Sequence, residues 1–219
     1  MRILMVVKYP PIEGGVSADS YWTAQMFAER GHEVHVLTNA NEVEEEYRII
    51  LAKDDLDFLA GYRKKNGITV HQTHVDNKHV FIPQTNPSIS KLVSLGLEIV
   101  REVQPDIIWS YYVEPYGVVS MMLSLMTGVP YTIRHAGSDL GRLLLTEQLA
   151  TLYSEVFRNA LLVYTQPDHH EKFLSMGVKS ERLARSFMSR YPADIFFASP
   201  RQKNSTDKFV IGIYGKTGF

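Results

Sequence analysis

The sequence contains no cysteine, no long apolar run and almost no net charge, and each of these absences excludes a class of protein. Without cysteine there is no disulfide, no thiol nucleophile and no cysteine-ligated metal. A membrane-spanning helix needs about 18 consecutive apolar residues, and no segment approaches that length. The net charge of −1 over 219 residues gives no overall attraction to nucleic acid. We therefore expect a cytoplasmic protein without a nucleic-acid partner.

Two common nucleotide-binding signatures are also missing. The loop at 8–20 contains the pair Gly14-Gly15, but it has neither a G-x-G-x-x-G pattern nor a P-loop ending in G-K-[ST]. The apolar run at 33–38 ends in VLTN, where a nicotinamide-binding sheet carries an acidic residue. Both absences argue against a nicotinamide-dependent oxidoreductase.

Short apolar runs alternate with longer amphipathic stretches along most of the chain. The apolar runs, which are predicted to be buried strands, cover 2–7, 33–38, 68–75, 106–111, 130–135 and 161–166. The amphipathic stretches, which are predicted to be helices, cover 16–30, 53–65, 87–103 and 117–128. The last is apolar nearly all round, so we expect it to be covered on both sides. The alternation predicts an α/β fold with a Rossmann-like parallel sheet and helices on both faces.

The amino-acid composition of the sequence changes near its end. Residues 190–208 contain two prolines and a polar tail, which is typical of an exposed linker. The final segment, FVIGIYGKTGF at 209–219, reads as a strand followed by a glycine-containing loop. We predict one α/β domain over 1–200, a linker over 201–208, and the first strand and loop of a second domain over 209–219.

Candidate site residues follow the predicted strands, because ligands of open parallel sheets bind beyond the carboxyl ends of the strands. Gly14 and Gly15 precede a helix whose amino end attracts phosphate. His135 ends another strand, and Asp139 follows it in the motif RHAGSDLGR. The alternatives are that the glycine pair only makes a turn, and that His135 is a satisfied histidine beside a capped turn.

A second group of candidates follows the strand at 106–111. Tyr111, Tyr112 and Glu114 combine aromatic faces with a carboxylate, which suits recognition of an acceptor sugar. The alternative is that the tyrosines pack beneath the following helix. A basic segment at 179–190 either contacts an anionic lipid surface or forms a solvated face.

Metal-binding patterns are weak throughout the sequence. Asp55 and Asp57 form a D-x-D pattern, but they lie in a charged stretch that is predicted to be helical rather than in a turn after a strand. The histidine pairs at 32 and 35 and at 71 and 74 are three residues apart in predicted strands, so each pair points to opposite faces. We expect no metal site.

Four blocks of the sequence carry a resemblance to a known family. They are PPIEGGVSAD at 10–19, MFAERGHEVHVLT at 26–38, QPDIIWS at 104–110 and GVPYTIRHAGSDL at 128–140. Their order and spacing resemble the N-terminal, acceptor-side half of a retaining glycosyltransferase of the GT-B fold, family 4. No block is specific alone, but together they span most of the predicted first domain.

The resemblance implies transfer of a sugar from a nucleotide-diphosphate sugar to a hydroxyl, with retention of configuration and without a bound metal or other cofactor. It implies that Gly14 and Gly15 pass close to the donor and that His135 meets the transferring sugar. Asp139 would orient its loop or an acceptor hydroxyl, and Lys216 would reach the donor phosphates. The acceptor would be a glycan, a lipid-linked glycan or a small molecule.

The resemblance also gives a meaning to the final segment at 209–219, which is similar to the first strand of the family's C-terminal, donor-binding domain. The Glu-x7-Glu motif with which family members contact the donor sugar belongs to that second half, and the chain stops before it. We therefore expect the 219-residue chain to be inactive alone, with at most weak nucleotide binding.

Two alternatives stay open beside the transferase. One is a non-catalytic module that binds a sugar or a nucleotide. The other is a nucleotide-sugar epimerase of the GT-B fold, because a fold alone does not determine the chemistry. Contact of the basic segment with lipid would place the protein at the inner face of a membrane.

Overall fold

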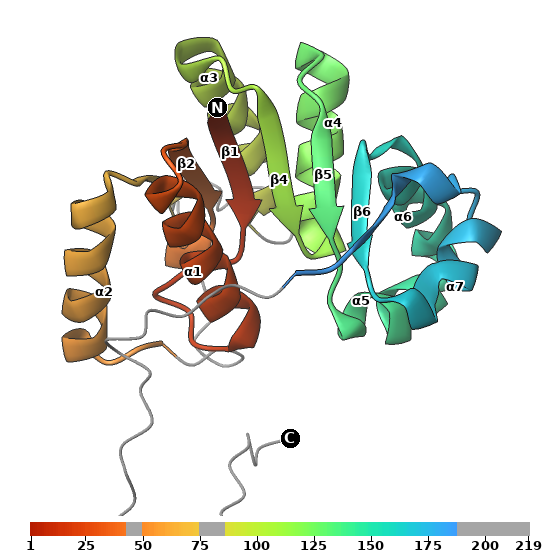
Figure 1. Cartoon of the computed structure of the whole chain (residues 1–219), viewed down its shortest axis with the longest axis horizontal. Coiled ribbons are helices and arrows are strands. Elements are labelled where there is room, and N and C mark those ends of the chain that lie inside the picture. The colour runs from red at the N-terminus through yellow and green to blue at the C-terminus, as the bar shows by residue number, and fades with distance from the viewer. Residues whose placement is uncertain (43–49, 75–85, 188–219) are drawn as a thin grey trace, which may run out of the picture.

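A parallel sheet of seven strands forms the centre of the computed structural model (Figure 1). The structure describes residues 1–42, 50–74 and 86–187. The strands are β1 Arg2–Val7, β2 Glu33–Thr38, β3 Thr69–Gln72, β4 Ile107–Tyr111, β5 Tyr131–Arg134, β6 Leu162–Thr165 and β7 Leu183–Arg185. Their order across the sheet is β3-β2-β1-β4-β5-β6-β7, and every neighbouring pair is parallel. The predicted α/β fold with a Rossmann-like sheet is confirmed.

Helices cover the two faces of this sheet. They are α1 Gly15–Glu29, α2 Lys53–Asn66, α3 Ser88–Val103, α4 Val118–Thr127, α5 Gly137–Gly141, α6 Glu147–Asn159 and α7 His170–Ser175. Short helical turns lie at η1 Ala40–Glu42, η3 Val113–Gly117, η4 Leu143–Leu145, η5 Pro167–His169 and η6 Ser180–Arg182. Figure 1 shows α1 and α2 in front of the sheet, and α3, α4 and α6 behind it.

The apolar runs form strands because both faces of the sheet are buried. In β1, Leu4 and Val6 belong to the cluster of core residues behind the sheet, whereas Ile3, Met5 and Val7 belong to the cluster in front. A strand covered on both sides has no solvent face for polar residues, so its sequence is continuously apolar rather than alternating.

Helix α3 has the buried apolar face that its sequence period predicts. Leu92 and Ile99 are buried, and Leu95 and Val103 pack partly buried against the same cluster, so the predicted apolar face is confirmed. The helix ends at Val103, shortly before Pro105, whose ring cannot continue a helix. The predicted helices at 16–30 and 53–65 are likewise observed within one residue of their predicted ends.

The structure differs from the prediction in three places. Of the strand predicted at 68–75, the described residues up to 74 form a strand only over Thr69–Gln72. Strand β7 was not predicted, because its three residues are too few for an apolar period to be seen. Helix α4 is not covered on both sides: it packs against α3, α6, β4 and β5, while Leu125 and Met126 are 73% and 60% exposed. Apolar residues on a surface are common, so apolar composition alone did not require a second cover.

The described part of the sheet ends with β7 at Arg185. The predicted linker at 201–208 and the predicted segment at 209–219, which carries Lys216, lie outside the described residues. Within residues 1–42, 50–74 and 86–187, none of the helices has the length and apolar character that crossing a membrane requires.

Candidate functional site

The order of the strands reverses between β1 and β4, and the ligand crevice of an open parallel sheet is expected at the carboxyl edge of that position. From β1 the chain continues outward through β2 and β3, and from β4 it continues through β5, β6 and β7 on the other side. Where strand order reverses in this way, the loops after the two central strands turn apart and leave a binding crevice. Gly14 and Gly15 follow β1, residues 111–114 lie at the end of β4, and His135 and Asp139 follow β5. The topology therefore brings the predicted residues to one edge.

The turn at Gly14 is shaped for close approach of a ligand. Gly14 has φ 133°, which side-chain-bearing residues rarely adopt, and it directly precedes α1. The first backbone amides of this 15-residue helix have no partners within it, so this end attracts anions. A Cβ added to Gly14 would lie 3.7 Å from the Nζ of Lys8. The sequence patterns missed Lys8, although it is the basic residue directly after the first strand.

His135 is held at both ring nitrogens by its neighbours. Nδ1 lies 3.2 Å from the carbonyl oxygen of Ala136, and Nε2 lies 2.8 Å from Oγ1 of Thr165. A carbonyl only accepts hydrogen bonds, so Nδ1 carries the proton and Nε2 accepts from the threonine hydroxyl. His169 and Phe173 pack against the ring with centroid distances of 5.5 and 5.1 Å. Burial lowers the pKa of His135 to about 4, so the imidazole is neutral at pH 7.

Asp139 is fully buried and connects two loops of the crevice. Its Oδ2 accepts hydrogen bonds from the backbone amides of Ala136, at 2.9 Å, and Val113, at 3.3 Å. The first of these lies after β5 and the second after β4. Burial raises the pKa of the carboxyl to about 6, although both amide bonds favour the charged form. Of its two predicted roles, this geometry favours orientation of the loop over contact with an acceptor hydroxyl.

An ion pair between Arg134 and Asp19 ties α1 to the end of β5. Both side chains are nearly buried, at 12% and 14% exposure. The guanidinium also lies over the ring of Tyr111, with its Cζ 4.7 Å from the ring centroid. Neither member of the pair was predicted, because 115 positions separate them in the sequence and only the fold brings them together.

The three predicted acceptor residues, Tyr111, Tyr112 and Glu114, are all at least partly buried at the end of β4. Tyr111 is 8% exposed, and burial raises the pKa of its hydroxyl. Oε2 of Glu114 accepts a hydrogen bond from the hydroxyl of Tyr153 on α6 at 3.1 Å. Tyr112 is half-buried with φ 79°, a conformation that costs a residue other than glycine roughly 1–3 kcal/mol. The alternative of packed tyrosines therefore fits Tyr111, and the acceptor role stays a prediction.

A cavity of about 220 Å³ lies beside His135, at the ends of β4, β5 and β6. Tyr111, Arg134, Thr165 and His169 contribute to its wall. Thr165 is a second residue that the sequence patterns missed. Its hydroxyl is what fixes the orientation of the histidine ring, and a threonine at the end of an apolar run carries no visible signal of that role.

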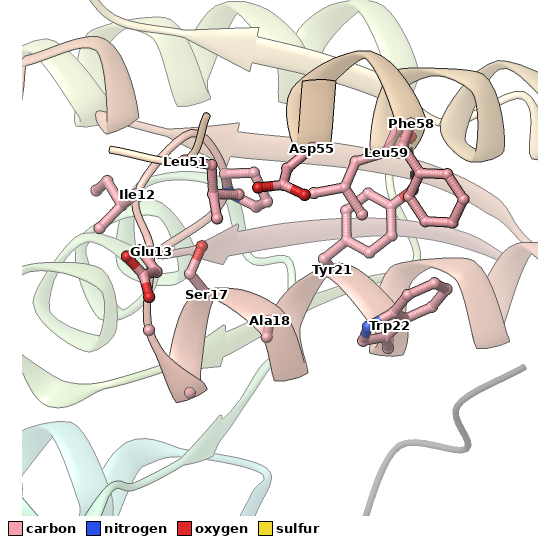
Figure 2. A pocket seen from close by; sticks show the side chains of 13 residues that line it. Ile12, Glu13, Ser17, Ala18, Tyr21, Trp22, Leu51, Asp55, Phe58 and Leu59 are labelled. Atoms are coloured by element: carbon pink, nitrogen blue, oxygen red, sulfur yellow. Dashed lines mark hydrogen bonds between the residues drawn. The ribbon is translucent and has the colours of Figure 1, made fainter. Parts of the chain in front are cut away.

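A larger cavity of about 520 Å³ lies between α1 and α2, and Figure 2 shows its lining. We call it the α1–α2 cavity. Gly14 and Gly15 form part of its wall, so it adjoins the turn that precedes α1. Asp55 also lines it. The predicted helical placement of Asp55 and Asp57 is confirmed, since both lie within α2.

The histidines that are paired in the sequence are arranged differently in space. His35 and His71 lie on the neighbouring strands β2 and β3, with Nδ1 of the first 3.0 Å from Nε2 of the second. Among the residues that the structure describes, no group of three or more histidine, aspartate or glutamate side chains is arranged to hold a metal ion.

The model of a family described as "Glycosyl transferase 4-like domain" matches residues 14–185. This match covers well over half of the chain and includes the glycine turn, His135 and Asp139. The chain belongs to this family. The resemblance of the four sequence blocks to a family 4 glycosyltransferase domain is thereby confirmed, and retention of configuration stays a prediction. No curated protein sequence matches the chain.

Several solved structures share the fold of this family member, which is that of one half of the GT-B fold. Anabaena HepE in complex with UDP-glucose aligns with a TM-score of 0.58 at 15% identity, covering 91% of this chain and 47% of HepE. A UDP-GlcNAc 2-epimerase from Neisseria meningitidis bound to UDP-GlcNAc aligns with a TM-score of 0.52 at 13% identity, covering 84% and 45%. MurG from Acinetobacter baumannii aligns with a TM-score of 0.50 at 11% identity, covering 87% and 46%. The family member described here thus spans about half the length of each of these proteins.

Proposed function

We propose that this chain is the acceptor-side domain of a glycosyltransferase that moves a sugar from a nucleotide-diphosphate sugar to a hydroxyl with retention of configuration. The family match over residues 14–185 carries the proposal, because it spans the crevice at the carboxyl edge of the sheet. The UDP-glucose bound to HepE and the UDP-GlcNAc bound to the Neisseria epimerase support a UDP-sugar as donor.

The donor diphosphate would lie at the turn that precedes α1. Gly14 and Gly15 let the backbone come close to the diphosphate. The backbone amides at the amino end of α1 would donate hydrogen bonds to its oxygens. Lys8 stands beside this turn as a cation, and Lys216 is proposed as a second one. Such fixed positive groups stabilise the charge that develops on the leaving diphosphate.

The sugar being transferred would meet His135. Because the imidazole is neutral, it adds no competing positive charge, and its Nε2 can accept a hydrogen bond from a sugar hydroxyl in exchange for the one from Thr165. Asp139 would act through its two amide contacts as a positioning residue. Transfer requires no resident metal in this proposal, because fixed amides and lysines meet the phosphate charge.

The test uses the product of the complete gene with UDP-glucose and UDP-GlcNAc as donors and a panel of glycosides as acceptors. Proton NMR of the product would report the anomeric configuration, which we expect to equal that of the donor. His135→Gln should lower the rate of transfer about tenfold or more, and His74→Gln, at an exposed histidine, is the matched control.

The same assay separates the alternatives. Inversion of the anomeric centre would contradict the retaining mechanism. Formation of the 2-epimer from UDP-GlcNAc without an acceptor would identify an epimerase instead, as in the Neisseria structure. Binding of UDP without turnover of either donor would leave a binding module.

A further inference from the structure

We infer that the α1–α2 cavity binds an uncharged sugar ring of the acceptor, so that the acceptor is a carbohydrate rather than an anionic lipid head or a charged metabolite. The inference rests on the proposed function, because only a transferase needs an acceptor. Nothing in the sequence pattern pointed to this cavity, since its two walls come from helices that are separate in the chain.

The location of the cavity fits an acceptor. Its volume of about 520 Å³ lies within the range of about 300–1,000 Å³ that is usual for small-molecule sites. Gly14 and Gly15 belong both to its wall and to the turn at which the donor phosphates would bind. A molecule in the cavity would therefore lie beside the donor, as transfer between the two requires.

Figure 2 shows how the polar groups of the cavity are placed. The hydroxyl of Ser17 on α1 and the carboxylate of Asp55 on α2 point from opposite walls into the space between the helices. Glu13 lies at one end with Ile12, and Phe58 lies toward the other end with Trp22. Carboxylate oxygens accept hydrogen bonds only, which makes them suitable partners for the hydroxyl donors of a sugar.

The ring of Phe58 supplies an apolar surface for a sugar, beside the polar groups of the cavity. The side chain of Phe58 is 49% exposed although it is one of the larger apolar groups of the described chain. A pyranose has one face made of C–H groups, and an accessible aromatic ring gives that face an apolar partner. An aromatic face combined with a carboxylate is also the predicted acceptor combination at Tyr111, Tyr112 and Glu114, and the α1–α2 cavity provides a second place for it.

Ser17 gives an independent indication of a ligand. It is 1% exposed, lines the cavity, and its hydroxyl has no hydrogen-bond partner in the structure. A buried hydroxyl without a partner costs roughly 1–3 kcal/mol. A hydroxyl of a bound sugar would remove that cost, whereas a purely apolar ligand would leave it in place.

The charged side chains that line the cavity are both acidic, and the anion-attracting amino end of α1 forms only one part of its wall. Glu13 and Asp55 are both exposed carboxylates, and the described residues that line the cavity include neither lysine nor arginine. A phosphate or carboxylate on the ligand would be repelled by both side chains at short range. The part of the acceptor that lies between these two carboxylates is therefore uncharged, and the glycine turn is left to the donor phosphates.

The test is direct binding to the 219-residue chain, and it needs no turnover. The probes are the methyl α-glycosides of glucose, mannose, galactose and N-acetylglucosamine, each raised to about 50 mM because single sugars bind weakly. Amide shifts followed by ¹H–¹⁵N NMR should change with saturation in residues 13–22 and 51–59. Failure of all four probes to shift these amides would overturn the inference, as would shifts confined to other regions.

Variants test the assigned chemistry. Asp55→Asn and Phe58→Ala should each weaken binding of the best glycoside about tenfold, while Asp54→Asn, on the same helix but outside the cavity, is the matched control and should leave it unchanged. Glucose 6-phosphate should bind at least about tenfold more weakly than methyl glucoside. Equal or tighter binding of the phosphate, or of cyclohexanol as an apolar ring, would contradict a neutral sugar site.

The outcome is separable from that of the proposed function. If UDP shifts the amides of the glycine turn while no glycoside binds, this inference fails and the transferase proposal stands. If glycosides bind in the α1–α2 cavity but the complete gene product transfers no sugar, the transferase proposal fails and the carbohydrate site remains.

Discussion

The cavity beside His135 and the α1–α2 cavity lie at the same end of the sheet, but their polar groups differ in whether they have partners within the protein. Beside His135, the protein itself occupies both imidazole nitrogens, and the guanidinium of Arg134 is bound to Asp19. In the α1–α2 cavity, the hydroxyl of Ser17 has no partner, and Glu13 and Asp55 are exposed.

This difference separates a region whose polar groups hold the loops in place from a region whose polar groups are available to a ligand. Groups already bonded to each other hold loops in place at a fixed geometry, and they contribute to stability in the unliganded protein. Groups without partners contribute nothing to stability until a ligand arrives, which is the usual compromise of binding sites. Substitutions beside His135 should therefore change folding, and substitutions in the α1–α2 cavity should mainly change binding.

The largest effect is expected from Asp139→Ala. It removes the acceptor of two amides, and two buried donors without partners should lower the free energy of unfolding by roughly 2–5 kcal/mol. Urea denaturation followed by tryptophan fluorescence measures the loss. Asp139→Asn keeps an acceptor oxygen and should lose less than half as much. A change below about 0.5 kcal/mol in Asp139→Ala, the size typical of a surface substitution, would show that the carboxylate does not hold the two loops.

The pH dependence of stability should separate Asp139 from His135. The folded pKa of Asp139, about 6, lies above its ordinary value of 3.8, so its contribution to stability rises as the pH falls through this window. The folded pKa of His135, about 4, lies below its ordinary value of 6.5, so its contribution is lost as the pH falls from 6.5 to 4. In the parent chain the two contributions oppose each other.

Single variants expose each contribution. Between pH 7 and about pH 4.5, Asp139→Asn should lose on the order of 2 kcal/mol of unfolding free energy relative to the parent, and His135→Gln should gain a similar amount. Denaturation curves at several pH values give the slopes. Three parallel slopes would contradict the assigned pKa directions.

Gly117→Ala tests how tightly the crevice is packed. An added Cβ would lie 2.7 Å from Cδ1 of Ile133 and 3.1 Å from the carbonyl oxygen of Tyr112. Overpacking of this kind costs about 1–3 kcal/mol, which thermal or urea unfolding would detect. Gly141→Ala is the matched control, because a Cβ there meets nothing within 4 Å. Equal stability of the two variants would mean that the loop after β4 can move aside.

The Arg134–Asp19 pair should show measurable coupling. A double-mutant cycle with Arg134→Met and Asp19→Asn is expected to give about 1–2 kcal/mol, because both partners are nearly buried. The exposed pair of Arg158 and Glu155, on one helix, is the comparison and should give about 0.3 kcal/mol. A coupling no larger than that of the exposed pair would show that the ion pair does not hold α1 to the end of β5.

The smallest effect is expected in the α1–α2 cavity, and its sign is opposite. Ser17→Ala removes a buried hydroxyl without a partner and should raise the free energy of unfolding by about 1 kcal/mol, the lower end of the cost of such a group. Ser110→Ala is the matched control, since that hydroxyl donates to the carbonyl of Thr132 at 3.1 Å and its loss should destabilise by about 1 kcal/mol. Destabilisation by Ser17→Ala would show that its hydroxyl is already bonded.

Much of the site was visible in the sequence as single positions, but not as contacts. The motif after β5 indicated His135 and Asp139, and the glycine pair indicated the start of α1. The partner of the histidine ring, Thr165, was not indicated, because a hydrogen bond between the ends of two strands produces no periodic pattern in the sequence. The acceptor role predicted for Tyr111, Tyr112 and Glu114 stays a prediction. The α1–α2 cavity gave no signal in the sequence, because its walls come from two helices that are separate in the chain.

The sequence by itself determined the alternation of strands and helices, since continuous apolar runs fit only strands buried on both faces and prolines or glycines mark the helix ends. It also determined the glycine turn, because φ 133° at position 14 favours that residue type. Only the tertiary structure decided which side chains meet. By placing β1 between β2 and β4, it set Asp19 against Arg134 and Ser17 opposite Asp55. Local patterns specify which face of an element is buried, whereas contacts between distant residues depend on strand order and helix packing, which no short stretch encodes.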